Sequence, residues 1–306
     1  MAIVLGIDGG GSKTVALLAD AQGHILGRGV AGPSNYQAVG AQAALDALEQ
    51  AAVAALAGSG QRMDSIQALC LGLAGVDRPE DRGLFERWAA QVMPAARLLV
   101  VNDAELLLAA GTPAGWGVAV IAGTGSIVVG RHPQGQTTRA GGWGYLLGDE
   151  GSGYAIGLAA LQAVARAADG RSPATRLTQA ILEAWGLKAP GDLIPRVYQG
   201  QTGRTDIARL ASLVEAVAGE GDEVAWEILR HAGRELALAV AAVTRRLGLA
   251  GPVPCAQGGG LLVKGRLVPA LFLEAAGALG LQLEPVSVVP EPAQGAVRLA
   301  VSLLKP

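Results

Sequence analysis

A repeated arrangement of strand, glycine turn and strand is the feature that most limits how this chain of 306 residues can fold. It occurs at residues 5–20 as LGIDGGGSKTVALLAD and again at residues 117–131 as GVAVIAGTGSIVVGR. Apolar, β-branched runs on both sides of a glycine cluster are typical of a β-hairpin. In both places a third short strand and helical patterns follow. We therefore predict one supersecondary unit that is present twice.

The first glycine cluster looks like a nucleotide-binding loop but fits neither common motif. A P-loop requires a lysine where this chain has Ser12, and the dinucleotide fingerprint read from Gly9 ends on Thr14 instead of a glycine. Both motifs also lead into a helix, whereas Thr14–Asp20 is predicted to be a strand. A glycine hairpin can nevertheless bind phosphate, because its successive backbone N–H groups can face an anion.

Asp8 stands beside this cluster and has two interpretations. A carboxylate next to a phosphate site would repel the phosphate unless a divalent cation lies between them. Alternatively, Asp8 bonds to the backbone of its own tight turn. The segment alone favours neither interpretation.

The composition excludes several classes of protein. With 51% hydrophobic residues the chain can bury two cores, and a net charge of −2 provides no basic face for nucleic acid. Cys70 and Cys255 lie far apart in apolar runs, so we expect neither a disulfide framework nor a metal cluster, and a reducing cytoplasm fits. Asp8 interrupts the first apolar run, and the uncharged residues 106–130 contain Pro113 and turn glycines. We therefore expect no signal peptide and no membrane span.

The remaining periodicities predict an α/β fold built from a duplicated βββαβαβα unit. In the first copy, helices are expected at 41–57, 81–92 and 104–110 and strands at 67–73 and 97–101. In the second copy, helices are expected at 153–168, 174–185, 206–218, 223–247 and 267–279 and strands at 253–257 and 283–289. An amphipathic helix at 294–304 is expected to pack back on the first half. Duplicated units of this kind place their glycine hairpins face to face across a cleft.

Asp103 lies in LLVVNDAELLLAAG, where a buried strand ends and a helix begins. An aspartate at such a junction is often an N-cap that accepts bonds from the first helical amides. The carboxyl end of a strand is also where ligands of α/β sheets bind, so the side chain could instead face a ligand. Both interpretations stay open from the sequence.

Residues 141–157, GGWGYLLGDEGSGYAIG, form a loop that is costly to order unless it binds something. Aromatic rings beside carboxylates suit a sugar, whose C–H face packs on a ring while its hydroxyls donate to charged oxygens. A helix cap at Asp149 or Ser152 is the alternative, and for Asp149 we favour ligand binding. Glu150 could be a solvated acid of the first helical turn. The glycines of CAQGGGLLVKG are a weaker signal for close approach by a ligand.

Together these segments resemble the actin-like superfold of sugar kinases and heat-shock ATPases. Within it they resemble the ATPase family that groups N-acetylglucosamine kinase with activators of 2-hydroxyacyl-CoA dehydratases. The motifs that carry the resemblance are GIDGGGSKT, GTGSI, NDA, GGWGYLLGDEGSGY and QGGG. The resemblance implies an actin-like ATPase fold, related to ribonuclease H, with two domains and an interdomain cleft. The N-terminal domain would comprise residues 1–114 and the C-terminal helix 292–306, and the second domain residues 115–291 with helical insertions.

The resemblance also implies roles for individual residues. Asp8 would lie near Mg²⁺, through water, and Asp103 would accept the proton of the attacking sugar hydroxyl. The residues implied to bind ATP are Gly9, Gly10, Gly11, Ser12, Lys13, Thr124, Gly125, Gly258, Gly259 and Gly260. The residues implied to bind the sugar are Asn35, Asp103, Ser126, Trp143, Gly144, Tyr145 and Asp149. One departure from the animal-type kinase is Ile127, which replaces an asparagine that faces the sugar.

The function implied is transfer of phosphate from ATP to the 6-hydroxyl of an amino sugar, either N-acetylglucosamine or glucosamine. N-acetylmuramic acid and glucose stay open as acceptors. ATP and Mg²⁺ are the expected cofactors, and the expected form is a cytoplasmic homodimer without nucleic-acid or membrane partners. The alternatives are an ATP-driven dehydratase activator, which needs cysteines for an iron–sulfur cluster, and a sugar sensor without catalysis.

Overall fold

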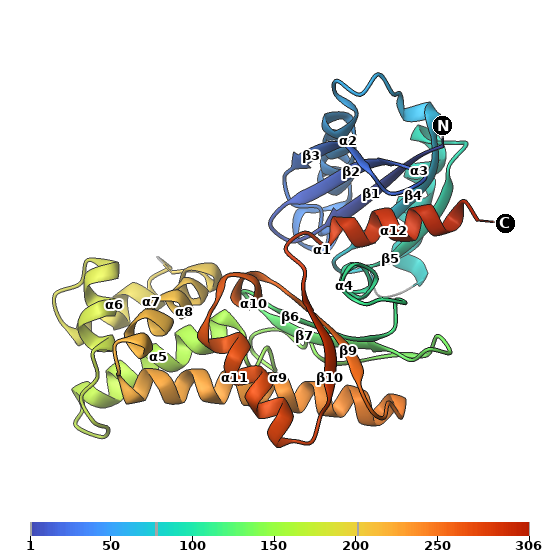
Figure 1. The fold of residues 1–306 in the computed structure, drawn as a ribbon. Coiled ribbons are helices and arrows are strands. Elements are labelled where there is room, and N and C mark those ends of the chain that lie inside the picture. The colour runs from blue at the N-terminus through green and yellow to red at the C-terminus, as the bar shows by residue number, and fades with distance from the viewer. Residues whose placement is uncertain (1, 77–78, 201, 306) are drawn as a thin grey trace. The chain divides into compact units, whose positions relative to one another are not determined.

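The chain divides into two compact units in a computed structural model that describes residues 2–76, 79–200 and 202–305. The first unit consists of Met1–Trp116 together with Val289–Pro306, and the second of Gly117–Val288 (Figure 1). The first unit is therefore built from both ends of the chain.

The sheet of the first unit has the strand order β3-β2-β1-β4-β5. Its strands are β1 (Ile3–Gly9), β2 (Thr14–Asp20), β3 (Ile25–Ala31), β4 (Ile66–Leu73) and β5 (Arg97–Asn102). The first three strands form an antiparallel meander, whereas β4 and β5 run parallel to β1. Because β1, β4 and β5 point the same way, their carboxyl ends share one edge of the sheet.

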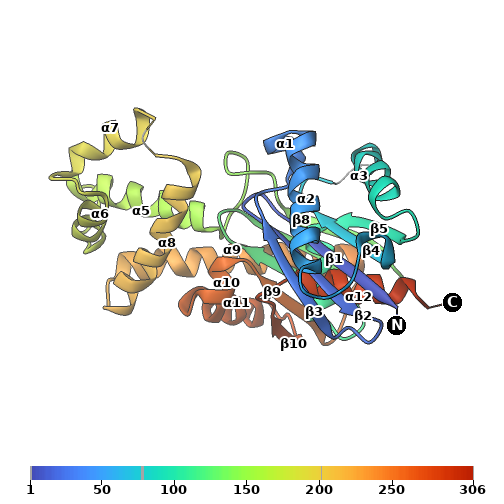
Figure 2. The ribbon, with the colours of Figure 1, turned by 90° about the horizontal axis from the view of Figure 1, so that it is seen from above.

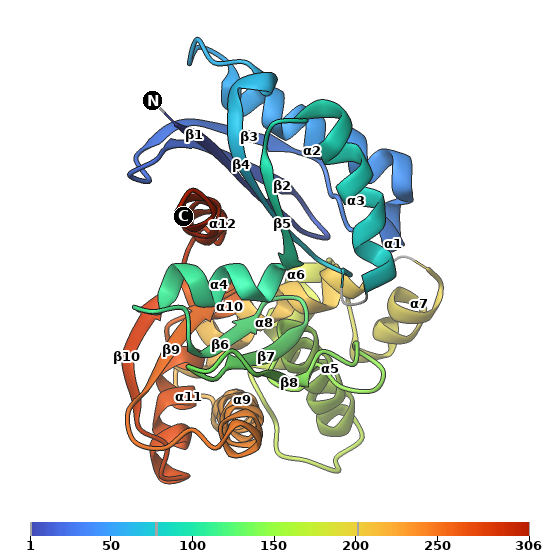
Figure 3. The ribbon, with the colours of Figure 1, turned by 90° about the vertical axis from the view of Figure 1, so that its right-hand side faces the viewer.

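Helices cover both faces of this sheet (Figure 3). They are α1 (Tyr36–Val39), α2 (Ala41–Leu56), α3 (Pro79–Val92), α4 (Asp103–Gly111) and α12 (Ala293–Leu303). Buried side chains of α2 and α3 join one core, and those of α4 and α12 join a second core on the opposite face. The C-terminal helix α12 lies directly on β1 because Gly6 has no side chain; a Cβ there would overlap the backbone of Val297.

The second unit repeats the topology of the first. Its strands are β6 (Gly117–Ala122), β7 (Ser126–Arg131), β8 (Thr137–Gly141), β9 (Val253–Gly258) and β10 (Leu283–Val288). Their order is β10-β9-β6-β7-β8, so that β6 takes the place of β1. Again the first three strands are antiparallel, and β9 and β10 run parallel to β6. The predicted duplication is thus confirmed.

Additional helices enlarge the second unit, and Figure 2 shows α5 and α8 side by side. The helices are α5 (Gly153–Ala168), α6 (Leu177–Trp185), α7 (Leu193–Tyr198), α8 (Arg204–Gly219), α9 (Glu223–Leu247), α10 (Gly260–Lys264) and α11 (Leu267–Ala278). Their apolar faces and the sheet form one continuous core. Within the described ranges, none of the helices is long and apolar enough to cross a membrane.

Helix α6 begins later than the sequence predicts. The predicted start is residue 174, but the helix starts at Leu177. The carboxylate of Asp222 accepts hydrogen bonds from the Thr175 hydroxyl at 3.0 Å and from the Arg176 backbone N–H at 2.8 Å. These bonds hold the preceding residues outside the helix, and they come from a distant part of the chain that local periodicity does not report.

Candidate active site

The turn of the first hairpin, residues 10–13, has an open backbone surface. The N–H of Gly10 donates to the carbonyl oxygen of Lys13 at 3.0 Å and closes the turn. Gly11, Ser12 and Lys13 are exposed. A Cβ at Gly11 would meet no atom within 4 Å, and the residue does not have a positive φ. Close approach of a ligand to this backbone would explain the glycine, whereas the packing of the unit does not.

Asp8 and Asp103 are at the shared carboxyl edge of the parallel strands β1, β4 and β5. The pKa of Asp8 is raised to about 7, chiefly by desolvation and also by the negative charges of Asp103 and Glu291, while the charge of Lys13 lowers it. The two aspartates therefore interact electrostatically. This edge carries an excess of negative charge that a cation would compensate.

The donor set at this edge fits magnesium. Carboxylate oxygens are ligands that Mg²⁺ prefers, and Mg²⁺ usually takes one or two of them together with water and substrate phosphates. Over the described residues, three or more His, Cys, Asp or Glu side chains do not gather anywhere in a way that could hold a metal. Asp8 would therefore contribute one ligand or a water-mediated contact, and the remaining ligands would come from a bound phosphate and from water.

Asp103 does not cap helix α4. The N-cap is Asn102, whose side-chain Oδ1 accepts a hydrogen bond from the Ala104 backbone N–H at 3.0 Å. Asp103 is the first residue of the helix itself. The cap interpretation of this aspartate is thus wrong, because its neighbour does the capping. The implied role of Asp103 as a base stays a prediction.

Asn35 has a structural role that the sequence did not suggest. It is the N-cap of the short helix α1, where its Oδ1 accepts from the Gln37 backbone N–H at 3.2 Å. The same oxygen lies against Gly75, since a Cβ at that glycine would be 3.0 Å from it. The implied contact of Asn35 with a hexosamine stays a prediction.

The second hairpin turn, residues 123–125, is held by the N-terminus of α5. The N–H of Gly123 donates to the carbonyl oxygen of Gly125 at 2.9 Å, which closes the turn. The Gly153 N–H donates to the Gly123 carbonyl at 2.7 Å, and the Tyr154 N–H donates to the Thr124 carbonyl at 3.3 Å. The carbonyls of Gly123 and Thr124 are thus occupied by the first residues of helix α5.

A cavity of about 420 Å³ is lined both by this turn and by the glycine cluster of residues 258–260. Its lining includes Gly123 and Thr124 from the hairpin and Gly260 from the turn after β9. Helix α8 closes another side with Thr205 and Ser212. The volume is within the range of small-molecule and cofactor sites. Two segments that the sequence assigned to ATP, one to the phosphates and one to adenosine, therefore line one pocket.

The two glycines after β9 differ in what they permit. Gly259 has a φ of +83°, and a Cβ on it would overlap the carbonyl of Ala122, so the fold itself requires glycine there. Gly260 has no neighbour within 4 Å of a Cβ position, and it faces the cavity. Gly258, the last residue of β9, is buried.

The loop of residues 142–152, which we call the aromatic loop, contains four residues with a positive φ. Gly142, Gly144 and Gly151 have positive φ, and so does Asp149 at +60°, the one non-glycine residue with this conformation in the described ranges. A non-glycine residue in this region costs free energy, and such residues often occur at functional sites. Trp143 is 68% exposed.

Ser152, not Asp149, is the N-cap of α5. The Ser152 Oγ accepts a hydrogen bond from the Ala155 backbone N–H at 3.1 Å. The cap interpretation of Asp149 is therefore wrong. Ser126, the first residue of β7, bonds to two residues of the aromatic loop. Its hydroxyl donates to the Glu150 carbonyl at 2.6 Å, and its carbonyl accepts from the Gly142 N–H at 3.1 Å.

Arg204 is the partner of Asp149, and the sequence analysis did not single it out. The carboxylate of Asp149 is buried, and Arg204 Nη2 donates to its Oδ2 at 2.7 Å. The guanidinium carbon of Arg204 also lies 5.4 Å from the centre of the Tyr145 ring. Arg204 is the first residue of α8. The sequence predicts this helix only from residue 206, and a pairing of two residues 55 positions apart leaves no local signal in the sequence.

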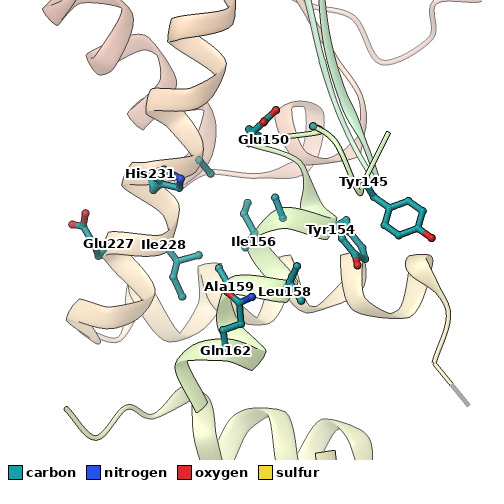
Figure 4. Close-up of a pocket in the computed structure, with 14 residues that line it drawn as sticks. Tyr145, Glu150, Tyr154, Ile156, Leu158, Ala159, Gln162, Glu227, Ile228 and His231 are labelled. Atoms are coloured by element: carbon teal, nitrogen blue, oxygen red, sulfur yellow. The ribbon is translucent and has the colours of Figure 1, made fainter. Parts of the chain in front are cut away.

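A separate cavity of about 450 Å³ lies between the aromatic loop, α5 and α9 (Figure 4). Tyr145 and Glu150 line it from the loop, and Tyr154 and Gln162 from α5. Glu227 and His231 of α9 complete the polar part of the lining. Sequence reasoning assigned no ligand to this cavity.

Two sheets of the same order, each with a glycine hairpin between its first two strands, define the actin-like class of two-domain ATPase folds. The chain belongs to the BadF/BadG/BcrA/BcrD ATPase family, whose sequence profile matches residues 5–300.

Relatives in this family include named sugar kinases. The chain is 39% identical over 249 residues to an N-acetylmuramic acid/N-acetylglucosamine kinase of Clostridium acetobutylicum, covering 81% of each chain. It is 36% identical over 257 residues to an N-acetyl-D-glucosamine kinase of Dictyostelium discoideum, again covering 81% of each. A crystal structure from Chromobacterium violaceum, provisionally described as an N-acetylglucosamine kinase, matches with a TM-score of 0.76 at 28% identity, over 98% of this chain and 99% of that one.

Proposed function

We propose that this protein is an ATP-dependent amino-sugar kinase that phosphorylates the 6-hydroxyl of N-acetylglucosamine. The observation that carries the proposal is the 39% identity, over 81% of both chains, to a kinase of N-acetylmuramic acid and N-acetylglucosamine. The placement of Asp8 and Asp103 at one sheet edge supports it, because phosphoryl transfer needs positioning, charge neutralisation and a proton acceptor.

Asp103 is the proposed general base. It would accept the proton of the sugar 6-hydroxyl while that oxygen forms a bond to the γ-phosphorus of ATP and the bond to the β,γ-bridging oxygen breaks. The products are ADP and the sugar 6-phosphate. Asp103 is the first residue of helix α4 and lies close enough to Asp8 for the two charges to interact.

The nucleotide is proposed to bind through backbone groups and not through a P-loop lysine. The exposed turn of residues 10–13 and the turn of residues 123–125 are each proposed to bind phosphate oxygens through backbone N–H groups. The cavity beside Thr124 and Gly260 would hold the nucleoside. Asp8 would hold Mg²⁺ through water, and bound Mg²⁺ supplies neutralisation of phosphate charge.

The aromatic loop is the proposed sugar site. Trp143 and Tyr145 offer ring faces, and Asp149 offers a carboxylate to a sugar hydroxyl. Asn35 and Ser126 are proposed as further contacts. Ile127 stands where the animal-type kinase has a polar side chain, so N-acetylmuramic acid, glucosamine and glucose remain acceptors to be tested.

The cysteines do not favour the dehydratase-activator alternative. Cys70 is buried in the first unit and Cys255 in the core of the second. Burial raises the pKa of both thiols, that of Cys255 to about 12. Thiols in this state are poor ligands for a cluster shared between subunits. A cytoplasmic location stays a proposal. A homodimer is also a proposal, and sedimentation of the purified protein would test it.

A phosphorylation panel tests the function. The purified protein is incubated with Mg·ATP and each of N-acetylglucosamine, glucosamine, N-acetylmuramic acid and glucose, and ADP release is measured. We expect N-acetylglucosamine to give the highest kcat/KM, with phosphorus on O6 by NMR. ADP formation that is independent of every sugar would contradict the kinase and favour an ATPase.

A further inference from the structure

Arg204 joins two parts of the second unit that the proposed function assigns to different ligands. Its guanidinium bonds to Asp149 and lies on Tyr145, both in the aromatic loop. It also touches the second hairpin, because a Cβ on Gly125 would be 2.5 Å from Arg204 Nη2 and 2.7 Å from Asp149 Oδ2. The Arg204–Asp149 pair therefore lies directly against the backbone of a turn proposed to bind phosphate.

The charge of Asp149 creates a problem at this position. Its side chain is 5% exposed and lies beside Gly125, where the proposed ligand is a polyanion. A buried carboxylate without a partner would repel the phosphates, and the repulsion is weakly screened away from water. Arg204 supplies one positive charge at 2.7 Å from one oxygen of that carboxylate. Among the described residues, no group donates a hydrogen bond to the other oxygen of Asp149, Oδ1.

We infer that Arg204 is a positioning residue that neutralises Asp149 beside the second hairpin and directs its Oδ1 toward the sugar. This inference rests on the proposed function. With Arg204 present, the turn can accept phosphates and the aromatic loop can accept a hydroxyl. The stacking of Arg204 on Tyr145 fixes the ring at the same time, and the planar guanidinium is suited to do both.

A single and a double substitution distinguish the effect of Arg204 on nucleotide binding from its effect on sugar binding. In Arg204→Gln the Asp149 carboxylate loses its counter-charge but stays beside the turn, so nucleotide binding should weaken. In the double variant with Asp149→Asn the uncompensated charge is gone, so nucleotide binding should recover. Sugar binding should stay impaired in both, because neither holds a correctly oriented carboxylate at position 149.

Arg230→Gln is the matched control. Arg230 lies in α9 of the same unit, is 47% exposed against 40% for Arg204, and bonds to Glu223 at 2.8 Å. Its guanidinium lies 5.7 Å from the Trp226 ring. It thus has the same kinds of contact as Arg204, but we place it in no binding site.

Binding of Mg·AMPPNP, measured by isothermal titration calorimetry, is the first readout because it does not need turnover. We expect the Kd of Arg204→Gln to rise about tenfold, as for a buried charge left unpaired. We expect the double variant to return to within about threefold of the unsubstituted protein, and Arg230→Gln to match it. If the double variant binds as weakly as Arg204→Gln, then Arg204 contacts phosphate itself and the inference is wrong.

Steady-state kinetics with N-acetylglucosamine give the second readout. We expect the sugar KM to rise at least tenfold in Arg204→Gln and in the double variant. Arg204→Lys keeps the charge but not the planar fork, so it should retain nucleotide affinity while its sugar KM rises. If the unsubstituted protein phosphorylates no sugar, the proposed function fails and the calorimetry still tests Arg204. If it does phosphorylate sugar and Arg204→Gln behaves like Arg230→Gln in both assays, only the Arg204 inference fails.

Discussion

At the scale of residues, the electrostatics of the carboxylates in the first unit are set by groups that lie near them in space but far from them in sequence. Asp8 belongs to a strand and Asp103 to a helix, yet each acts on the other through the shared edge of the sheet. Glu291, from the C-terminal part of the chain, adds to the same field and bonds to Arg28 at 2.7 Å. The chemistry at this edge is thus set by charges from three separate segments.

The pH dependence of stability should report the burial of Asp8. An aspartate whose folded pKa is raised to about 7 binds its proton more tightly folded than unfolded. The proton on Asp8 therefore contributes fully to the free energy of unfolding below about pH 4. This contribution, up to about 4 kcal/mol, is lost as the pH rises through about 7. We expect Asp8→Asn, without Mg²⁺ or nucleotide, to be more stable than the unsubstituted protein at pH 8, with the difference shrinking towards pH 5.

Thermal unfolding at pH 5 and pH 8 measures this difference. Asp46→Asn, which removes an exposed carboxylate of the same unit, is the control for a surface charge. A constant difference between Asp8→Asn and the unsubstituted protein at the two pH values would show that Asp8 does not titrate in this range.

Asp103→Asn should separate chemistry from binding. A general base contributes about 10²–10⁴-fold to a rate, so kcat should fall by about that factor. The Kd for Mg·AMPPNP should change little, because the variant keeps the backbone groups proposed to bind phosphate. A loss of nucleotide affinity equal to the loss of rate would refute the assignment of Asp103 as the base.

Asp149→Ala should act on the sugar. The variant removes the carboxylate that is proposed to accept a sugar hydroxyl, so its KM for N-acetylglucosamine should rise more than its kcat falls. Initial rates across a range of sugar concentrations give both constants. An unchanged sugar KM would remove Asp149 from the proposed sugar site.

At the scale of elements, glycine decides how closely helices approach the first sheet. Gly6 of β1 allows the backbone of α12 onto the strand, and Gly295 of α12 allows the helix onto the carbonyl of Leu106 in α4. The amphipathic pattern of residues 294–304 predicts which face of the helix is buried. The elements that this face contacts are determined only by the packing of the folded unit. Helices α5 and α9 have the predicted ends because their caps are local.

Gly6→Ala should destabilise the first unit. The added methyl group would overlap the backbone of Val297, and overpacking a core typically costs about 1–3 kcal/mol. We expect a loss at the upper end, because a backbone cannot rotate away as a side chain can. Gly32→Ala is the control, since a Cβ there meets no atom within 4 Å. Chemical denaturation of both variants measures the costs, and equal midpoints would contradict the packing of α12 on β1.

At the scale of the whole molecule, the first unit combines the two ends of the chain, and the second unit is inserted between them in sequence. Val289–Pro306 belongs to the unit that begins at Met1, while Gly117–Val288 is continuous. The face of the first sheet that carries Cys70 is covered by α12. Cys255 lies in the core of the other unit.

Removal of residues 291–306 should therefore expose one thiol and not the other. We expect the full-length protein to react slowly with a thiol reagent such as DTNB, because both cysteines are buried. The shortened chain should show one fast thiol, which Cys70→Ser in the same chain removes. Two fast thiols would mean that the second unit depends on α12, and none would mean that α12 does not protect Cys70.

The sequence by itself determined the duplication, the two glycine hairpins, most long elements and the kinds of side chain at the candidate site. These are local properties, since alternation, helical period and turn residues are written within a few positions of one another. The short helices α1, α7 and α10, of four, six and five residues, fall below the length at which a period can be read.

Only the tertiary structure decided which residue performs which local task. It gave the N-cap of α4 to Asn102 and that of α5 to Ser152, so that neither Asp103 nor Asp149 caps these helices. It also joined Arg204 to Asp149 across 55 positions of sequence. A contact between two charges at such a separation leaves no periodic trace in the chain, because it arises from the packing of finished elements.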